Sequence, residues 1–329
     1  MRKNLPAVWA FSSALLASQA LAAERLPALG ASGNDVTVSG ISSGGYMAGQ
    51  FHLAHSKTVS GIGIIAAGPY YCAQGSVRTA LGACVKGEIE VPPLLAAARA
   101  AADGNSIDAI SGVRDDRVWL FHGTLDETVR AGVVSAARDF YSALATPANI
   151  TLVDTIVVTH GLPTRATGQD CRKAASPYLN ACNYDAAGAM LESLLGELKP
   201  AVEPKGRLIE FEQSEFGDAN LNATGFAYVP RACAAGAACR VHVFFHGCGQ
   251  SNEVVGDVVV RGAGFNEWAE SNSLVVLYPQ VKSSTFAPLN PLGCWDWWGY
   301  SGEAYATREG AQVKAVQAMI DRLAEKAPR

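Results

Sequence analysis

Short runs rich in Val, Ile and Phe alternate with alanine-rich stretches along almost the whole chain of 329 residues. The runs predict strands at 35–41, 59–66, 117–122, 150–158, 207–213, 225–230, 240–245 and 273–279. The stretches between them predict helices at 43–56, 92–103, 128–145, 186–197, 256–271 and 307–325. Strands this apolar need burial on both faces, which a mostly parallel sheet with helices on both faces provides. The alternation therefore predicts the α/β class.

The first 23 residues differ from the rest. Arg2 and Lys3 precede an apolar stretch that ends in small residues around Ala22, which is typical of a secretory signal peptide. A membrane anchor would need about 20 apolar residues, and this run is shorter. We expect a signal peptide at 1–23, export to the periplasm or the medium, and no membrane partner. Residues 24–329 are expected to form a single catalytic domain, because neither side of the linker-like stretch 198–206 would make a complete sheet alone.

Charge and cysteine content exclude two kinds of partner. The formal net charge is −4 and no basic stripe is visible, so the electrostatic signature of a nucleic-acid binder is missing. Eight cysteines in an exported chain predict four disulfides. A metal site would need C-x-x-C or clustered Cys and His, and neither occurs, so we expect no metal. Eight cysteines allow 105 connectivities. Pairing of sequence neighbours would give Cys72–Cys84, Cys171–Cys182, Cys233–Cys239 and Cys248–Cys294.

A G-x-S-x-G pattern at 40–44 lies between the strand at 35–41 and the helix at 43–56. This context is typical of a nucleophile elbow, in which Ser42 would sit on a sharp turn that Gly40 and Gly44 tolerate. The helix N-terminus would also present the Ser43 N–H to an oxyanion. The alternative is an ordinary Gly/Ser bend. A nucleophilic serine needs a base and an orienting acid. The choice between an elbow and a bend therefore depends on whether the rest of the chain supplies both.

Asp126 and His160 are the candidate acid and base, since each lies in a loop just beyond a predicted strand. Asp126 could instead cap the helix at 128–145. Asp115 and Asp116 precede their strand and would fall at the opposite edge of the sheet. The competing histidines are expected on a helix face (His52, His55) or packed in strands (His122, His242). The order Ser…Asp…His is that of the α/β-hydrolases.

One expected motif is displaced. In α/β-hydrolases an HG-type oxyanion loop and several strands precede the serine, but here only one strand does. The HG pattern occurs far downstream, in VHVFFHGCGQS at 241–251. We therefore predict a circularly permuted α/β-hydrolase fold, in which the strands at 207–279 form the first half of the sheet.

Five motifs in this order, GISSGGYMA, FHGTLDETV, THGLPT, FFHGCGQS and NPLGCWDWWG, resemble the secreted poly(3-hydroxybutyrate) depolymerases of the circularly permuted, single-domain kind. The resemblance covers about residues 30 to 325. It implies a serine esterase that hydrolyses the polyester or its oligomers through an acyl-enzyme, without cofactor or metal. By it, Ser42 is the nucleophile, Asp126 orients the base His160, and the Ser43 and Cys248 N–H groups form the oxyanion hole. We expect a monomer.

The segment CWDWWGY, which starts at Cys294, holds three of the six tryptophans. If Cys294 is bonded to Cys248, then Trp295, Trp297, Trp298 and Tyr300 would lie beside the reacting carbonyl, and Trp297, Trp298 and Tyr300 are the expected substrate-binding residues. The alternative is that some of these tryptophans are core residues. Many family members carry a separate polymer-binding domain that this sequence does not show, so polymer capture is expected on the catalytic domain, and soluble oligomers are an alternative substrate. The rival functions are a secreted carbohydrate esterase and a non-catalytic polymer-binding protein, which would need a broken triad.

Overall fold

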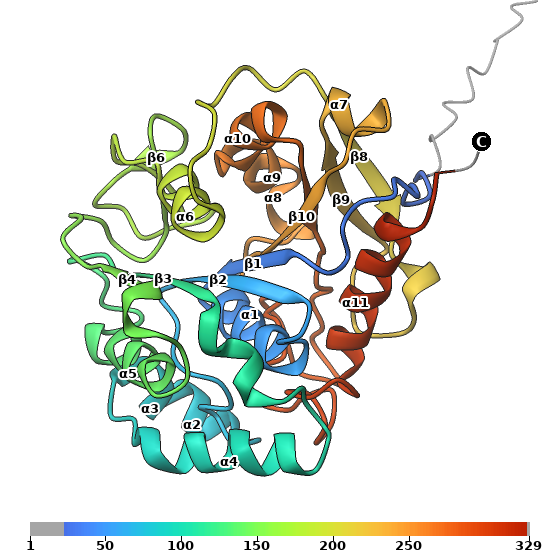
Figure 1. The fold of residues 1–329 in the computed structure, drawn as a ribbon. Helices are drawn as coiled ribbons and strands as arrows, with labels where there is room; N and C mark the ends of the chain where they lie inside the picture. Colours follow the sequence, from blue (N-terminus) through green and yellow to red (C-terminus); the bar gives the residue numbers. More distant parts are fainter. Residues whose placement is uncertain (1–22, 328–329) are drawn as a thin grey trace, which may run out of the picture.

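The computed structural model describes residues 23–327, so the expected signal peptide lies outside them except for its last residue. An eight-stranded sheet forms the centre of the molecule (Figure 1), with the order β4-β3-β2-β1-β10-β11-β9-β8. Its strands are β1 Val36–Ile41, β2 Val59–Ile65, β3 Arg117–Phe121, β4 Ile150–Val153, β8 Arg207–Glu212, β9 Thr224–Val229, β10 Arg240–Phe245 and β11 Leu274–Tyr278. β9 runs opposite to the other seven strands, antiparallel to both β11 and β8.

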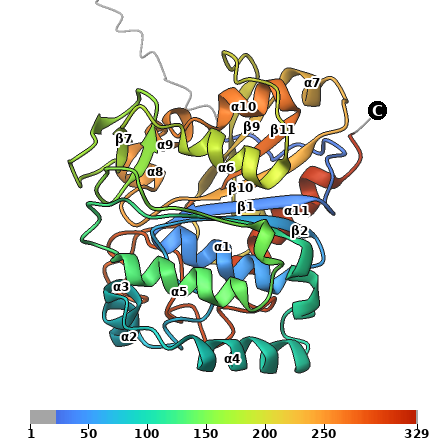
Figure 2. The same cartoon turned by 60° about the vertical axis from the view of Figure 1, so that its left-hand side comes forward.

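Helices cover both faces of this sheet (Figure 2). One face carries α1 Ser43–Ala54, α2 Val77–Leu81, α3 Ala83–Lys86, α4 Val91–Asp103, α5 Ala131–Ser142 and α11 Ala311–Ala324. The other carries α6 Ala186–Leu195, α8 Asn252–Val255, α9 Val258–Gly262 and α10 Phe265–Asn272. The short helices α7 Arg231–Ala234, η1 Ile110–Asp115, η2 Pro147–Asn149 and η3 Ser214–Phe216 lie in connections. The predicted layered α/β architecture is confirmed; β1 and β11 are buried along their whole length, and β10 is buried from Val241 on.

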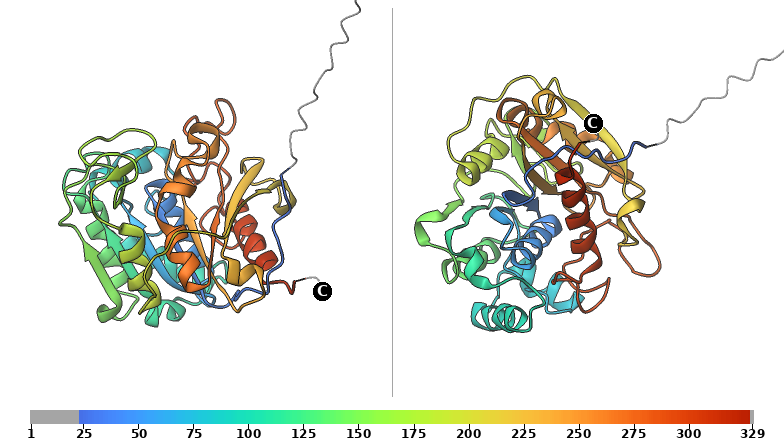
Figure 3. Two further views of the ribbon diagram at one scale, coloured as in Figure 1. Left: turned by 90° about the horizontal axis from the view of Figure 1, so that it is seen from above. Right: turned by 45° about the vertical axis from the view of Figure 1, so that its right-hand side comes forward.

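The two halves of the chain meet at β1 and β10. These strands pair in parallel, from Val36 opposite Val241 to Gly40 opposite Phe245. The four C-terminal strands therefore complete the sheet that the N-terminal strands begin, as the permuted arrangement predicts. The start and end of the described chain also lie side by side (Figure 3), where the Gly30 N–H donates to the Glu325 carbonyl at 2.7 Å. Ends this close are what a permutation requires, because the ancestral order can be restored by a short connection.

Local details differ from the prediction in three places. The helix expected at 256–271 is broken into α9 and α10, because Gly264 has a φ of +92° and a helix cannot continue through it. The strand expected at 150–158 ends at Val153, and the residues after it bond the loop that follows β3. A small three-stranded sheet was not predicted; it contains β5 Leu162–Thr164, β6 Gln169–Asp170 and β7 Leu179–Ala181.

Four disulfides join the cysteines that are neighbours in sequence, as expected: Cys72–Cys84, Cys171–Cys182, Cys233–Cys239 and Cys248–Cys294. The first three close short loops, whereas the fourth spans 46 positions and ties two segments that are distant in sequence. Within residues 23–327, none of the helices is both long and apolar enough to cross a membrane.

The first turn of α1 is pressed against the end of β10. A Cβ atom on Gly44 would lie 2.1 Å from the Phe245 carbonyl oxygen and 2.4 Å from that of His246. Both contacts are with backbone, which cannot move aside as a side chain could. Glycine at this position is therefore what allows the helix to dock on the sheet.

We expect Gly44→Ala to lower the free energy of unfolding by about 3 kcal/mol or more, because the added methyl overlaps fixed backbone atoms. Gly49→Ala is the matched control in the same helix, since a Cβ there would meet only the Tyr141 hydroxyl at 3.9 Å. The control should be neutral or stabilising by up to about 1 kcal/mol. Urea unfolding of both variants measures this, and equal stability for the two would contradict the packing argument.

Candidate active site

Ser42 occupies a strained turn between β1 and α1, with φ of 56° and ψ of −123°. Positive φ is uncommon for a residue other than glycine and costs of order 1–3 kcal/mol, so the surrounding structure must impose it. The Ser42 N–H donates to the Ile65 carbonyl of β2 at 2.9 Å, and the Ser42 carbonyl accepts from Gly45 and Tyr46. Ser42 is thus held on a tight strand-to-helix turn rather than in a loose bend.

Two backbone N–H groups flank Ser42 without bonding other groups. Within the part of the chain that the structure describes, neither the Ser43 N–H at the start of α1 nor the Cys248 N–H makes a hydrogen bond. Both residues lie next to Ser42: Ser43 follows it in the chain, and Cys248 lines the same crevice. Free donors in a partly buried place are what a developing oxyanion needs.

Asp126 and His160 form a buried pair in the loops after β3 and β4. The Asp126 Oδ2 atom lies 2.8 Å from His160 Nδ1. The other carboxylate oxygen, Oδ1, accepts the backbone N–H groups of Thr128 and Val129 at 2.9 Å each. The Asp126 carboxylate therefore bonds both the backbone of its own loop and the His160 imidazole. It thus combines the capping role and the orienting role that were considered for it. The other ring nitrogen, Nε2, does not bond Asp126. His160 and Ser42 line the same crevice.

A second buried histidine–carboxylate pair lies elsewhere. His52 Nε2 is 2.8 Å from Asp116 Oδ2, and the Tyr141 hydroxyl is 3.1 Å from His52 Nδ1. His52 was expected on an ordinary helix face, but it is fully buried and connects α1 to the start of β3 and to α5. Asp116 lies at the start of β3, at the edge of the sheet away from Ser42, as its place before the strand predicts.

His242 and His246 are both buried in β10 or at its end. His242 lies between the hydroxyls of Thr37 and Ser39 on β1, at 2.8 Å from each. His246 Nδ1 donates to the Gly247 carbonyl oxygen at 2.7 Å. His246 Nε2 accepts the Val281 N–H at 3.1 Å. Burial lowers the pKa of His242 to about 3 and that of His246 to about 4. Both rings are therefore neutral at pH 7.

The aromatic segment is joined by the Cys248–Cys294 disulfide to the loop that follows β10. Trp295 is fully buried, and Trp297 is stacked on Tyr46 of α1 with ring centroids 4.3 Å apart. The expectation that Trp295 and Trp297 form part of an open substrate wall therefore needs correction, because Trp295 is not exposed at all and only 6% of Trp297 is.

Trp298 and Tyr300 are half-buried, and one carboxylate holds the turn that carries them. Asp296 Oδ1 accepts the N–H groups of Trp298, Gly299 and Tyr300, and Oδ2 accepts the N–H and hydroxyl of Ser301. The Tyr300 hydroxyl donates to the Cys294 carbonyl and accepts from Gln312 Nε2, so it stabilises this turn. Of the three tryptophans in this segment, Trp298 is the one that is not buried.

The crevice at Ser42 also contains two residues that the sequence did not indicate, Tyr178 and Gln250. Gln250 directly follows the HGCG pattern, which is a signal that could have identified it. Tyr178 comes from the loop closed by Cys171–Cys182, for which no motif was recognised. The Tyr178 ring meets the His160 ring edge-on, with centroids 6.2 Å apart.

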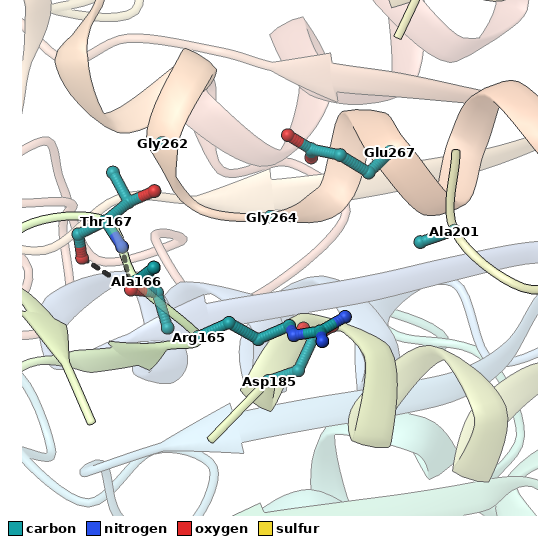
Figure 4. Close-up of a pocket in the computed structure, with 9 residues that line it drawn as sticks. Arg165, Ala166, Thr167, Asp185, Ala201, Gly262, Gly264 and Glu267 are labelled. Carbon is teal, nitrogen blue, oxygen red and sulfur yellow. Dashed lines mark hydrogen bonds between the residues drawn. The ribbon is translucent and has the colours of Figure 1, made fainter. Parts of the chain in front are cut away.

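A separate hollow of about 160 Å³ opens between the small sheet and α9–α10 (Figure 4). Arg165, Asp185 and Glu267 line it, and none of its lining residues lines the crevice at Ser42. Burial raises the pKa of Glu267. Asp185 caps α6 through Gly188 and accepts the Trp268 N–H, so its carboxylate is already used in the fold. No cluster suited to a metal ion occurs in residues 23–327.

Comparison with known proteins gives a consistent result, although no family model matches the chain. The poly(3-hydroxybutyrate) depolymerase of Delftia acidovorans is 42% identical over 311 residues, which span 92% of this chain but 62% of that protein. The polyhydroxybutyrate depolymerase of Talaromyces funiculosus is 34% identical over 94% of this chain and 95% of its own length.

Solved structures agree with the sequence comparison. A PHB depolymerase from Penicillium funiculosum has a TM-score of 0.86 at 32% identity, over 91% of this chain and 98% of its own. A PHB depolymerase with a serine-to-alanine substitution, in complex with an R3HB trimer, has a TM-score of 0.87 at the same identity and coverage. The α/β-hydrolase fold is thereby shown.

We expect the free energy of unfolding to fall as the pH is lowered from about 6.5 to about 4, because the unfolded chain binds protons that native His246 and His242 exclude. Each histidine should contribute a slope of up to about 1.4 kcal/mol per pH unit within this window. Urea unfolding of wild type and His242→Gln at several pH values measures it. The variant should show the shallower dependence, and identical slopes would contradict the assignment.

Proposed function

The chain belongs to the family of polyhydroxybutyrate depolymerases, and we propose that it is an exported serine esterase that hydrolyses poly(3-hydroxybutyrate) or its oligomers. One observation carries the proposal. Ser42 on its strained elbow, His160 with its buried partner Asp126, and Cys248 with its free N–H group belong to one crevice. Nucleophile, base, orienting acid and oxyanion donors are the set that acyl transfer requires. Four disulfides support export.

In the proposed mechanism, His160 Nε2 takes the Ser42 proton as the hydroxyl attacks an ester carbonyl. Asp126 holds His160 in the required tautomer and stabilises the imidazolium that forms. The alcohol end of the polymer then leaves with the proton from His160. Water repeats the sequence on the acyl-enzyme and releases the hydroxyacid, so Ser42 and His160 return to their starting states.

The proposed oxyanion hole consists of the Ser43 and Cys248 N–H groups. Each such donor is worth about 3–4 kcal/mol of transition-state stabilisation when it is preorganised. Ser43 is held by the helix α1, and Cys248 is held by its disulfide to Cys294. Both donors therefore face the reacting carbonyl without having to reorganise.

Polymer contact is proposed for the apolar surface next to this hole. The loop before Cys294 exposes Phe286, Leu289 and Leu292, and the Leu292 carbonyl accepts the Gly249 N–H at 2.7 Å. Together with Trp298 these side chains offer apolar area to an aliphatic polyester close to the oxyanion loop. We propose that residues 24–329 bind and cleave the substrate as a single, monomeric catalytic domain.

We expect Ser42→Ala and His160→Ala each to lower turnover of soluble hydroxybutyrate oligomers by about a thousandfold or more. His52→Gln is the matched control, because His52 belongs to an equivalent buried pair away from Ser42. It should lower the melting temperature but keep kcat within about threefold. Product analysis of solid polyester, oligomers and acetylated xylan side by side distinguishes the polyester reaction from carbohydrate-ester hydrolysis. A Ser42→Ala protein that keeps more than about a tenth of the rate would refute the assignment.

We expect replacement of both Cys248 and Cys294 by serine to lower the melting temperature and kcat together, since the oxyanion loop loses its anchor. Closure of this loop contributes ~4 kcal/mol by loop-entropy arithmetic. The control replaces Cys233 and Cys239, which bridge six positions at the opposite end of β10. That variant should lose stability without losing kcat. Unchanged kcat in the Cys248/Cys294 variant, or an equal loss of kcat in both variants, would contradict the proposed role of Cys248–Cys294.

A further inference from the structure

Gln250 is a buried glutamine whose side-chain amide is bonded at both ends, and only 2% of the residue is exposed. Its Oε1 atom accepts the Gly247 N–H at 2.6 Å. Its Nε2 atom donates to the Pro177 carbonyl at 2.8 Å, with the Tyr178 carbonyl at 3.5 Å. One side chain therefore joins the oxyanion loop to a loop of the small sheet.

On the first side, the Gln250 side chain holds the N–H of Gly247, whose carbonyl belongs to the next peptide, the one that presents the proposed oxyanion donor. The Cys248 N–H belongs to the same peptide unit as the Gly247 carbonyl, and the planar trans peptide points the two groups in opposite directions. That carbonyl accepts from His246 Nδ1 at 2.7 Å and from the Gln250 backbone N–H at 3.3 Å. With the Gly247 N–H also held by the Gln250 side chain, the direction of the Cys248 N–H is determined.

On the other side, Gln250 reaches the wall beside the base. The Tyr178 carbonyl also accepts the Leu162 N–H at 2.8 Å, two residues after His160. Tyr178 has a φ of 55°, which its neighbours must impose. Its ring lines the crevice and meets the His160 ring edge-on. The position of this wall relative to Cys248 thus depends on the Gln250 amide.

We propose that Gln250 is a positioning residue, which fixes the Cys248 N–H relative to Ser42 and His160; this rests on the proposed esterase function. It acts through Gly247 and Tyr178 and does not itself hold the oxyanion. The orientation of an oxyanion donor matters in the transition state more than in the bound ester, so its loss should appear in kcat. A displaced donor costs about 10- to 100-fold in rate.

The test compares Gln250→Met with Asn266→Leu. Methionine keeps the length of glutamine and removes both hydrogen bonds. Asn266 is a matched buried amide on α10, bonded to the Val260 carbonyl and the Tyr278 hydroxyl, and none of these three residues lines the crevice. The readouts are kcat and KM for p-nitrophenyl butyrate, melting temperature, and the inhibition constant of an alkyl trifluoromethyl ketone, whose serine adduct carries an oxyanion. If Gln250→Met does not fold, Gln250→Asn is measured in its place.

For the Gln250 variant we expect kcat to fall 10- to 100-fold with KM within about threefold, and ketone affinity to fall by about the same factor as kcat/KM. Asn266→Leu should lose comparable melting temperature while kcat stays within twofold. A Gln250 variant with kcat within twofold of wild type overturns the inference, as does an equal loss of kcat in both variants. Wild-type protein inactive toward the ester would overturn the proposed function itself.

Discussion

Parallel pairing of β1 with β10 is the contact on which the rest of the structure depends. It joins the two halves of a permuted chain into one sheet and makes both strands end at the same edge. The serine turn leaves one strand and the loop that carries Cys248 leaves the other, so this pairing brings Ser42 and Cys248 to the same crevice. Gly44 makes it possible, because the helix that follows Ser42 lies directly on the last residues of β10. Fold and site therefore share one packing constraint.

Two buried histidine–carboxylate pairs in this protein have the same N–O distance of 2.8 Å. His52 and Asp116 are enclosed between α1, β3 and α5, so their pair serves to connect elements of the fold. His160 and Asp126 lie at the carboxyl edge of the sheet, where the second imidazole nitrogen faces the crevice. The geometry of a pair thus does not identify a site. A site is identified by the position of the pair in the sheet and by the access of substrate to the histidine ring.

Two loops, one at the crevice and one in the aromatic segment, are each fixed by a buried polar side chain with several hydrogen bonds. Asp296 holds the turn that carries Trp298, and Gln250 holds Gly247 and the Tyr178 wall. Satisfied buried polar networks make loops rigid, because breaking one leaves an unpaired group at a cost of about 1–3 kcal/mol. A flexible polyester chain would then meet walls that are already in place, which lowers the entropy cost of binding.

The sequence by itself determined the α/β alternation, the permuted order and the candidates Ser42, Asp126 and His160, because each depends on residues close together in the chain. A strand, its turn and the loop after it are local features. The tertiary structure alone decided that Trp297 is buried against Tyr46 and that Gln250 bonds Pro177, whose positions are 73 residues apart. Packing and buried hydrogen bonds join segments that periodicity cannot relate, since they depend on where the folded sheet brings its loops.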